Sequence, residues 1–247
     1  MMDSSRPVVI ITGAARRVGA VVAETLCEAG YDLAVSYRHS RGDAEALAAR
    51  CEAKRAQSCL LLPLDLSDMA GLAPFIERVV THYGRIDALI NNASSFYPTA
   101  IGATTSADWD ELFSTNAKAP FFLAQAAAPH LAKTRGCILN FVDIYGQRPL
   151  SQHPVYSMAK AALAMMTMAL AKDLGPAVRV NGIAPGAVLW PEVGKATGER
   201  RELIARTPLA RAGEPADIAR TALFLLRDAP YITGEIIRVD GGRALSI

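Results

Sequence analysis

Short apolar runs alternate with longer amphipathic stretches along most of this chain. Most of the apolar runs are bounded by glycine, aspartate, asparagine or serine, which is the pattern of a fully buried strand. The predicted strands are residues 7–12, 31–37, 58–67, 86–94, 137–142, 178–186 and 235–242. The stretches between the first four strands predict helices, one ending near Gly30 and two others over residues 42–56 and 73–84.

This alternation predicts the architecture. Strands separated by helices of about 10–15 residues favour a parallel sheet that is covered on both faces. The fold class is therefore α/β, a Rossmann-like doubly wound sheet whose ligand crevice lies at the carboxyl ends of the strands. No repeat and no Pro/Ser-rich linker divides the sequence, so we expect a single domain over residues 1–247.

Composition narrows the function classes. Apolar residues make up 51% of the chain, charged residues 20%, and the formal charge is +2, which gives no reason to expect nucleic-acid binding. No apolar run approaches the ~18 residues of a membrane span. The cysteines form no closely spaced pair, so we expect reduced thiols in a cytoplasmic protein and neither a disulfide framework nor a metal site. They are Cys27, Cys51, Cys59 and Cys137.

A glycine-bearing turn, TGAARRVG at residues 12–19, connects the first predicted strand to the first helix. Such a turn suits a pyrophosphate, because backbone N–H groups and the positive end of the helix dipole face the anion. The same turn also occurs where close packing of strand and helix needs glycine. The candidate dinucleotide-binding residues here are Thr12, Gly13, Arg17, Val18 and Gly19.

Two further strand ends face the same crevice. Asp65 and Leu66 end the third strand, and Asn91 and Ala93 lie at the end of the fourth. Because the carboxyl ends of parallel strands meet at one edge of a sheet, these residues add to the dinucleotide site. Asp65 is placed to accept a hydrogen bond from an adenine amino group.

The end of the second strand indicates which dinucleotide binds. An NAD site carries an acid about 20 residues past the glycines to bind the ribose 2′-hydroxyl. This chain instead reads SYRHSR, with Arg38, His39, Ser40 and Arg41 and no acid before Asp43. A ribose 2′-phosphate is stabilised by such donors and repelled by an acid. NADPH is the predicted cofactor, and the alternative is a solvated basic loop.

Taken together, these motifs resemble the short-chain dehydrogenase/reductase family over nearly the whole chain. The motifs are TGxxxRxG at 12–19, NNA at 91–93, Asn116, Tyr156-x-x-x-Lys160, and Pro185-Gly186. The resemblance implies an NAD(P)H-dependent oxidoreductase in which Tyr156, Lys160, Pro185 and Gly186 also contact the cofactor. It further implies that Asn116 positions Lys160 through a water molecule.

The spacing of Tyr156 and Lys160 places them on one face of a helix predicted to begin near Val155. A phenol has a pKa of roughly 10 and is a poor base at neutral pH. A nearby ammonium group favours the phenolate, so we expect Lys160, helped by the cationic oxidised nicotinamide, to lower the pKa of Tyr156.

Within the family, TGAARRVG, NNASSFYPT at residues 91–99 and Asp143 resemble the pteridine reductases, whereas the family at large commonly has NNAG and a catalytic serine in place of the acid. This resemblance implies that Phe96 stacks on a pterin, that Ser94 hydrogen-bonds it, and that Arg17 faces both the pterin and the cofactor phosphate. The alternative for Phe96 is an ordinary core aromatic.

Asp143 distinguishes two chemistries. Carbonyl reduction builds negative charge on an oxygen, which a hydroxyl stabilises and an ionised carboxylate opposes. Pterin reduction adds hydride to a C=N unit, and the ring nitrogen must receive a proton. An acid hydrogen-bonded to Tyr156 can help to deliver that proton and can bind the amino-rich edge of the heterocycle. Asp143 and Tyr156 are therefore predicted to be catalytic residues that also bind the substrate.

Three functions remain open at this point. The first is NADPH-dependent reduction of a dihydropterin, with oxidised pterin, dihydrofolate or folate as further substrates. The second is another short-chain reductase, such as a 3-oxoacyl-thioester reductase, and the third is a catalytically idle NADPH sensor. Residues 187–212 are the predicted substrate lid, with Leu189 and Trp190 as its apolar wall or as packing residues. The resemblance favours a homotetramer, in which the Met-rich run 165–170 is core or subunit interface.

Overall fold

Seven parallel strands form one sheet in the computed structural model, which describes residues 6–188 and 197–246. They lie in the order β3-β2-β1-β4-β5-β6-β7. The bounds are β1 Val8–Ile11, β2 Asp32–Tyr37, β3 Cys59–Pro63, β4 Ala88–Asn91, β5 Cys137–Phe141, β6 Arg179–Pro185 and β7 Ile236–Val239. All seven predicted strands and the Rossmann-like α/β fold are therefore confirmed, although each strand is shorter than its apolar run.

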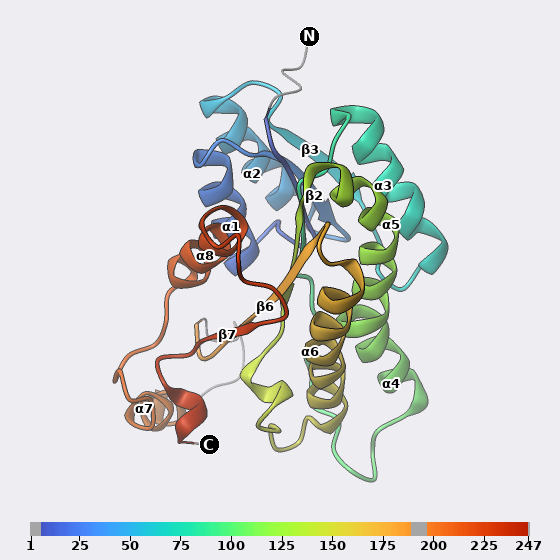
Figure 1. Ribbon diagram of the computed structural model, residues 1–247. Coiled ribbons are helices and arrows are strands. Elements are labelled where there is room, and N and C mark those ends of the chain that lie inside the picture. The colour runs from blue at the N-terminus through green and yellow to red at the C-terminus, as the bar shows by residue number, and fades with distance from the viewer. Residues whose placement is uncertain (1–5, 189–196, 247) are drawn as a thin grey trace.

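Helices cover both faces of the sheet (Figure 1). One layer holds α1 (Arg17–Glu28), α2 (Arg41–Lys54) and α8 (Pro215–Leu223), and the other holds α3 (Met69–Tyr83), α5 (Ala119–Thr134) and α6 (Pro154–Leu174), with α4 (Ser106–Phe113) beside α6. Alternate side chains of β1 serve the two layers: Val9 and Ile11 pack toward the first, Val8 and Ile10 toward the second. Burial on both faces explains why the strands are continuously apolar.

The strand order reverses direction between β1 and β4, because the chain runs from β1 outward to β3 and then returns to β4 beside β1. Loops leaving the carboxyl ends of these two strands diverge and leave a crevice at this switch point. The glycine turn leaves β1 and the segment NNASSFYPT begins in β4. The fold therefore brings together the two most distinctive motifs of the sequence.

Helix α6 is long and apolar. By length and composition alone it could cross a membrane, as can the core helix of a globular protein. Half of its apolar window is buried inside the protein, and it packs against β6. Its apolar character follows from this position in the second helical layer.

The four cysteines are free, in keeping with the expected reduced thiols, and all are buried. The fold brings three of them together despite their wide spacing: the Cys27 thiol faces the Cys51 carbonyl at 3.9 Å, and the Cys51 thiol neighbours those of Cys27 and Cys59. Burial and then Cys51 raise the pKa of the Cys27 thiol, and Cys59 and then burial raise the pKa of the Cys51 thiol, which makes both poor nucleophiles.

Part of the predicted lid, including Leu189 and Trp190, lies outside the described residues. The described part contains α7 (Thr197–Ala205), which is followed by a turn that leads to α8. Four short segments complete the elements: η1 (Ser114–Lys118), η2 (Ile144–Gly146), η3 (Phe224–Asp228) and η4 (Arg243–Leu245).

Candidate active site

The glycine turn packs directly on the loop after β4. Gly13 has a φ of +61°, and a Cβ added there would lie 2.8 Å from the Cβ of Ala93. A Cβ on Gly19 would lie 2.6 Å from Nδ2 of Asn92. The hydroxyl oxygen of Thr12 accepts hydrogen bonds from the backbone N–H groups of Asn92 (3.0 Å) and Ala93 (3.1 Å). Both glycines are therefore needed for the approach of the two loops.

The basic loop after β2 lies beside the end of β3. Arg38 forms an ion pair with Asp65, with 3.9 Å between Nη1 and Oδ1. The backbone N–H and hydroxyl of Ser67 donate to the same carboxylate at 2.9 and 2.7 Å. These bonds, then Arg38 and His39, hold the pKa of Asp65 below its usual value. Ser40 precedes α2 as its N-cap residue.

A cleft of about 170 Å³ connects these two regions. Its walls come from the turn after β1, the end of β2, the segment after β3 and the loop after β4, and they include Gly13, Ser36, Arg38, Leu64, Leu66, Ala93 and Ser94. Five of the ten residues that line this cleft were predicted from the sequence to bind cofactor or substrate: Gly13, Arg38, Leu66, Ala93 and Ser94. A mixed polar and apolar groove with a cation at one end can hold a phosphorylated nucleoside.

Three predicted catalytic residues lie together beside the loops that line this cleft: Tyr156, Asp143 and Lys160. The phenol of Tyr156 donates to Oδ2 of Asp143 at 2.7 Å, and the backbone N–H of Tyr145 donates to Oδ1 at 2.9 Å. Lys160 donates from Nζ to the carbonyl of Phe141 at 2.8 Å. Tyr156 and Lys160 are 4% and 2% exposed, so both polar ends are held away from water. The predicted contact between the acid and the phenol is present.

Asn116 is fixed within the π-helical segment η1, where α4 passes into α5. Its amide nitrogen donates to the carbonyls of Ser95 (3.0 Å) and Leu112 (2.9 Å), and its oxygen accepts from the hydroxyl of Ser94 at 2.6 Å. π-Helical turns are rare and occur often at functional sites. The Asn116 side chain thus orients the loop after β4.

Phe96 lies over the reacting group. Its ring is edge-on to Tyr156, with 4.8 Å between centroids and planes at 83°, and stacked on His153, with 4.7 Å and 13°. Phe96 remains 48% exposed, so it is not a core aromatic. A half-exposed ring beside a buried phenol offers a surface for a flat ligand.

A family model described as enoyl-(acyl carrier protein) reductase matches residues 13–244, which is nearly the whole chain. The protein belongs to the short-chain dehydrogenase/reductase family. It is therefore an oxidoreductase of a family whose members use nicotinamide cofactors.

Two relatives show how this short-chain dehydrogenase/reductase compares with others. The chain is 34% identical to pteridine reductase 1 of Leishmania tarentolae over 281 aligned residues, which cover 97% of each protein. It is 33% identical to a 3-oxoacyl-[acyl-carrier-protein] reductase of Staphylococcus aureus over 237 residues, covering 94% of this chain and 96% of the relative. The two identities are nearly equal, so overall similarity establishes the family and leaves the substrate to the site residues.

The electrostatics of this reductase correct one expectation. The pKa of Tyr156 is raised well above its ordinary value, first by burial and then by the charge and hydrogen bond of Asp143. The sequence predicted a lower value because of Lys160, but the ammonium group is bound to the Phe141 carbonyl and lies 5.8 Å from the centre of the phenol ring. Burial likewise raises the pKa of Asp143 and lowers that of Lys160 to about 8.

Other residues that were predicted to bind the cofactor make contacts within the fold. The amide of Asn91 donates to Asn140 on β5 at 2.8 Å, while its own oxygen is buried without a partner among the described residues. Gly186 lies against β7, where an added Cβ would come within 2.7 Å of the Asp240 Cα. Pro185 ends β6, and Arg17 begins α1 on the surface with a φ of +57°. Their contacts with a cofactor remain predictions.

Three residues of the site were missed from the sequence. Asn92 donates from Nδ2 to the carbonyls of Thr12 (2.8 Å) and Gly13 (3.1 Å), and Ser36 accepts from the N–H of Gly13 at 3.2 Å. His153 stacks on Phe96. Asn92 belongs to the NNA motif and was discoverable there, whereas nothing local marks Ser36 or His153.

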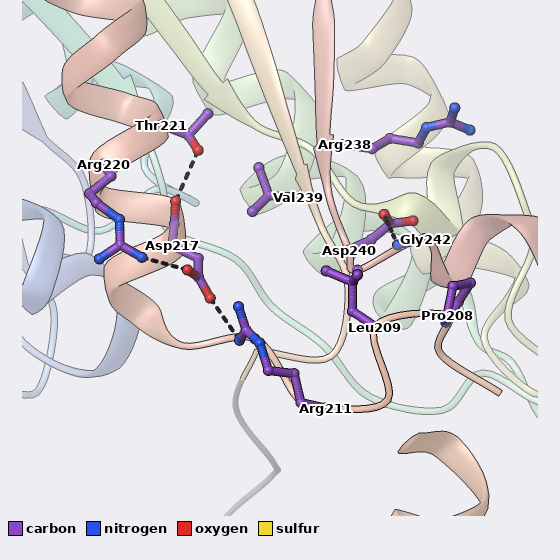
Figure 2. A pocket seen from close by; sticks show the side chains of 12 residues that line it. Pro208, Leu209, Arg211, Asp217, Arg220, Thr221, Arg238, Val239, Asp240 and Gly242 are labelled. Atoms are coloured by element: carbon purple, nitrogen blue, oxygen red, sulfur yellow. Dashed lines mark hydrogen bonds and ion pairs between the residues drawn. The ribbon is translucent and has the colours of Figure 1, made fainter. Parts of the chain in front are cut away.

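A larger cleft lies elsewhere. About 600 Å³ in volume, it is found at the end of β7, and none of the predicted catalytic residues lines it. Figure 2 shows Asp217 between two cations, with Arg220 at 2.6 Å and Arg211 at 3.3 Å. Pro208, Leu209 and Arg211 from the end of the predicted lid form one wall. Asp217 and Asp240 are carboxylates, but the glycine turn and the basic loop line the smaller cleft, so we place the dinucleotide site there.

The buried lysine predicts a pH effect on stability. Burial lowers the pKa of Lys160 from 10.5 to about 8 in the folded state, so the folded state binds fewer protons than the unfolded state between these pH values. Stability then rises with pH across this window. Relative to Lys160→Met, the wild type should gain up to about 3 kcal/mol in unfolding free energy from pH 8 to pH 10.5, at about 1.4 kcal/mol per pH unit. Urea unfolding at several pH values measures this.

The matched control is Lys172→Met, which removes an exposed lysine from the same helix. Its stability difference from the wild type should not change with pH in this way. A pH-independent difference for Lys160→Met as well would show that burial does not shift the ionisation of Lys160.

Proposed function

We propose that this protein is an NADPH-dependent pteridine reductase that converts a dihydropterin to the tetrahydro form. The hydrogen bond between Tyr156 and Asp143, 2.7 Å long and donated by a buried phenol, carries the proposal. An ionised carboxylate at this position opposes an oxyanion, whereas the protonated acid can help to deliver a proton to a ring nitrogen. Phe96, half exposed beside Tyr156, supports a flat substrate.

The chain's own residues provide proton delivery and positioning. When bound, NADPH supplies the hydride. Tyr156 keeps its proton at neutral pH because burial and Asp143 raise its pKa, which suits a proton donor rather than a base. Asp143 accepts from this phenol and holds its own proton to a higher pH than an ordinary carboxyl, since burial raises its pKa. Lys160 connects α6 to the end of β5, because its ammonium group donates a hydrogen bond to the Phe141 carbonyl.

The test of this function is NADPH oxidation measured with dihydrobiopterin, dihydromonapterin, dihydrofolate and an acetoacetyl thioester. Turnover of a dihydropterin with little turnover of the thioester supports the proposal. Turnover of the thioester alone assigns the protein to 3-oxoacyl reduction. NADPH binding without oxidation of any of the four compounds favours the sensor.

The cofactor residues fit a phosphorylated dinucleotide. The glycine turn forms a cradle that a Cβ would fill, and Arg38 lines the cleft. The first acid after β2 is Asp43, and its carboxylate pairs with Arg16 at 3.6 Å. We expect NADPH to exceed NADH in kcat/KM by about 10²-fold, since charge-assisted hydrogen bonds contribute about 1.5–3 kcal/mol each. Steady-state kinetics with both cofactors measure this ratio.

Arg38→Leu sharpens this cofactor prediction. It should reduce the preference for NADPH mainly through a higher KM for that cofactor and leave NADH use nearly unchanged. Arg50→Leu, which removes an exposed arginine of α2 that pairs with Glu24 of α1, is the control. Equal use of the two cofactors by the wild type would contradict the role of the basic loop.

Phe96→Ala should raise KM for the dihydropterin more than it affects NADPH binding. Lost stacking is worth about 0.5–1.5 kcal/mol beyond the buried area, so KM should rise by roughly 3- to 10-fold. Substrate kinetics and NADPH fluorescence titration separate the two effects. An unchanged pterin KM with collapsed NADPH affinity would make Phe96 a scaffold residue.

Assembly and location complete the proposal. Large apolar side chains are exposed on α4, α5 and α6, which supports association of copies into a homotetramer through these helices. They are Trp109, Phe121, Phe122, Met158, Met165 and Met168. Light scattering on the purified protein measures the assembly. Four buried free thiols are compatible with the reducing cytoplasm.

A further inference from the structure

Three polar side chains form a hydrogen-bonded chain through the buried layer between the sheet and α6. Asn140 of β5 and Thr167 of α6 are fully buried, and Asn91 at the end of β4 is 3% exposed. Asn91 donates from Nδ2 to Oδ1 of Asn140 at 2.8 Å, and Asn140 donates from Nδ2 to the hydroxyl oxygen of Thr167 at 2.9 Å. Buried polar groups that are bonded to one another restrict the packing around them to one arrangement.

The helical end of this chain determines the direction of its bonds. The hydroxyl of Thr167 donates to the carbonyl of Leu163, one turn earlier in α6, at 2.8 Å. A hydroxyl carries one proton and a carbonyl carries none, so Thr167 must accept from Asn140. Asn140 therefore directs its NH2 group at α6 and its oxygen at β4. In this single orientation it attaches β5 to one particular hydroxyl of the helix.

A second hydrogen bond attaches α6 to β5 nearer the site. Lys160 donates from Nζ to the carbonyl of Phe141 at 2.8 Å, and Phe141 follows Asn140 in the strand. Thr167 comes seven residues after Lys160, so the two lie on the same face of α6, about 10 Å apart along its axis at ~1.5 Å per residue. One contact alone allows a helix to pivot or slide, whereas two contacts at different heights fix its register against the strand.

The hydrogen bond between Tyr156 and Asp143, 2.7 Å long, continues this series of contacts. The three contacts between the β5 segment and α6 are Asp143 with Tyr156, Phe141 with Lys160, and Asn140 with Thr167. The strand numbers fall as the helix numbers rise, because the strand runs toward the site and the helix runs away from it. A shift of α6 along its axis therefore changes the distance between the phenol and the acid. A displacement of about 1 Å can cost roughly 10²-fold in rate.

We propose that Asn140 and Thr167 are positioning residues that hold the phenol of Tyr156 against Asp143. Loss of their hydrogen bond allows α6 to pivot about the Lys160 contact, so the phenol and the acid are less often within hydrogen-bonding distance. The inference rests on Tyr156 and Asp143 as the reacting pair of the proposed function. It does not depend on which compound accepts the hydride.

Thr167→Val tests the proposal, because it removes the hydroxyl at nearly constant volume. We expect kcat per folded protein to fall by about 10- to 100-fold with whichever of the four compounds is reduced, while KM for that compound and for NADPH stays nearly unchanged. Thr167→Ser keeps the hydroxyl and should retain most of kcat. Thr167→Ala should match the valine variant, and it takes its place if that variant does not fold. An unchanged kcat in a folded variant without the hydroxyl would make the bond a contribution to stability alone and overturn the proposal.

Thr134→Val is the matched control for lost stability. Thr134 ends α5, and its half-buried hydroxyl donates to the carbonyl of Ile86 at 2.7 Å, before the start of β4 and thus at the opposite end of the sheet from the site. Loss of this hydrogen bond should lower Tm and leave kcat unchanged. A fall in kcat as large as that of Thr167→Val would show that any destabilisation impairs turnover, and it would also overturn the proposal.

A measurement without substrate separates this proposal from the proposed function. The ¹³Cζ resonance of labelled Tyr156, assigned by its loss in Tyr156→Phe, reports hydrogen bonding at the phenol oxygen. Thr167→Val and Thr167→Ala should shift this resonance, whereas Thr167→Ser and Thr134→Val should not. The absence of a shift in the first two variants would overturn the positioning role even if dihydropterin is reduced. A shift in a protein that reduces none of the four compounds would support the positioning role and reject the pteridine reductase instead.

Discussion

Replacing Tyr156 with phenylalanine should lower kcat for dihydropterin reduction by a factor of about 10² to 10⁴, the usual contribution of a positioned general acid. The substitution removes only the phenolic O–H. The ring remains, and with it the edge contact to Phe96 at 4.8 Å and the packing of Lys160. Steady-state kinetics measure the loss, and fluorescence titration should show nearly unchanged NADPH binding.

Tyr145→Phe is the matched control for this loss. Tyr145 lies two residues after Asp143 and contacts it through its backbone N–H, which the substitution keeps. The Tyr145 ring packs against the cluster that contains Tyr156. The hydroxyl that donates to Asp143 is that of Tyr156. A nearly wild-type kcat in Tyr156→Phe would mean that the substrate nitrogen receives its proton from another group.

Asp143→Ser should depress dihydropterin turnover by about 10²-fold or more and leave NADPH binding nearly intact. The change removes the carboxylate that accepts from the phenol at 2.7 Å and restores a hydroxyl at this position. A hydroxyl can stabilise a forming alkoxide, so weak activity on activated ketones is expected in the variant. NADPH oxidation with dihydropterin and with the acetoacetyl thioester measures both effects.

Asp143→Asn separates charge from shape. In the wild type the Tyr145 N–H donates to Oδ1 of Asp143 at 2.9 Å. An asparagine can still accept this hydrogen bond, but it cannot pass on a proton. A relay role predicts that this variant is as poor as Asp143→Ser, whereas a purely positional role predicts that it keeps most activity. If both variants reduced dihydropterin at the wild-type rate from about pH 5 to pH 8, where carboxyl and imidazole groups titrate, the carboxylate would be incidental. The function would then depend on NNASSFYPT alone.

The sequence by itself determined the fold and the composition of the site. Continuous apolar strands such as residues 7–12 bury both faces, and this pattern persists whatever packs against them. The position of the helix that carries Tyr156 and Lys160 also followed from local spacing, since it begins at Pro154, one residue from the predicted start. The acid at 143 was recognisable as unusual because the surrounding motifs set its context.

Only the tertiary structure decided how these groups act on one another. Asp143 and Tyr156 are 13 residues apart and Ser94 and Asn116 are 22 apart, so their hydrogen bonds depend on how β4, β5 and η1 meet. Burial raised the pKa of Tyr156 and outweighed the expected lowering by Lys160. Local spacing does not reveal burial. The stack of Phe96 on His153 joins two loops that no periodicity relates. Contacts between distant segments arise from packing of the whole chain, and this is why they were beyond the reach of sequence patterns.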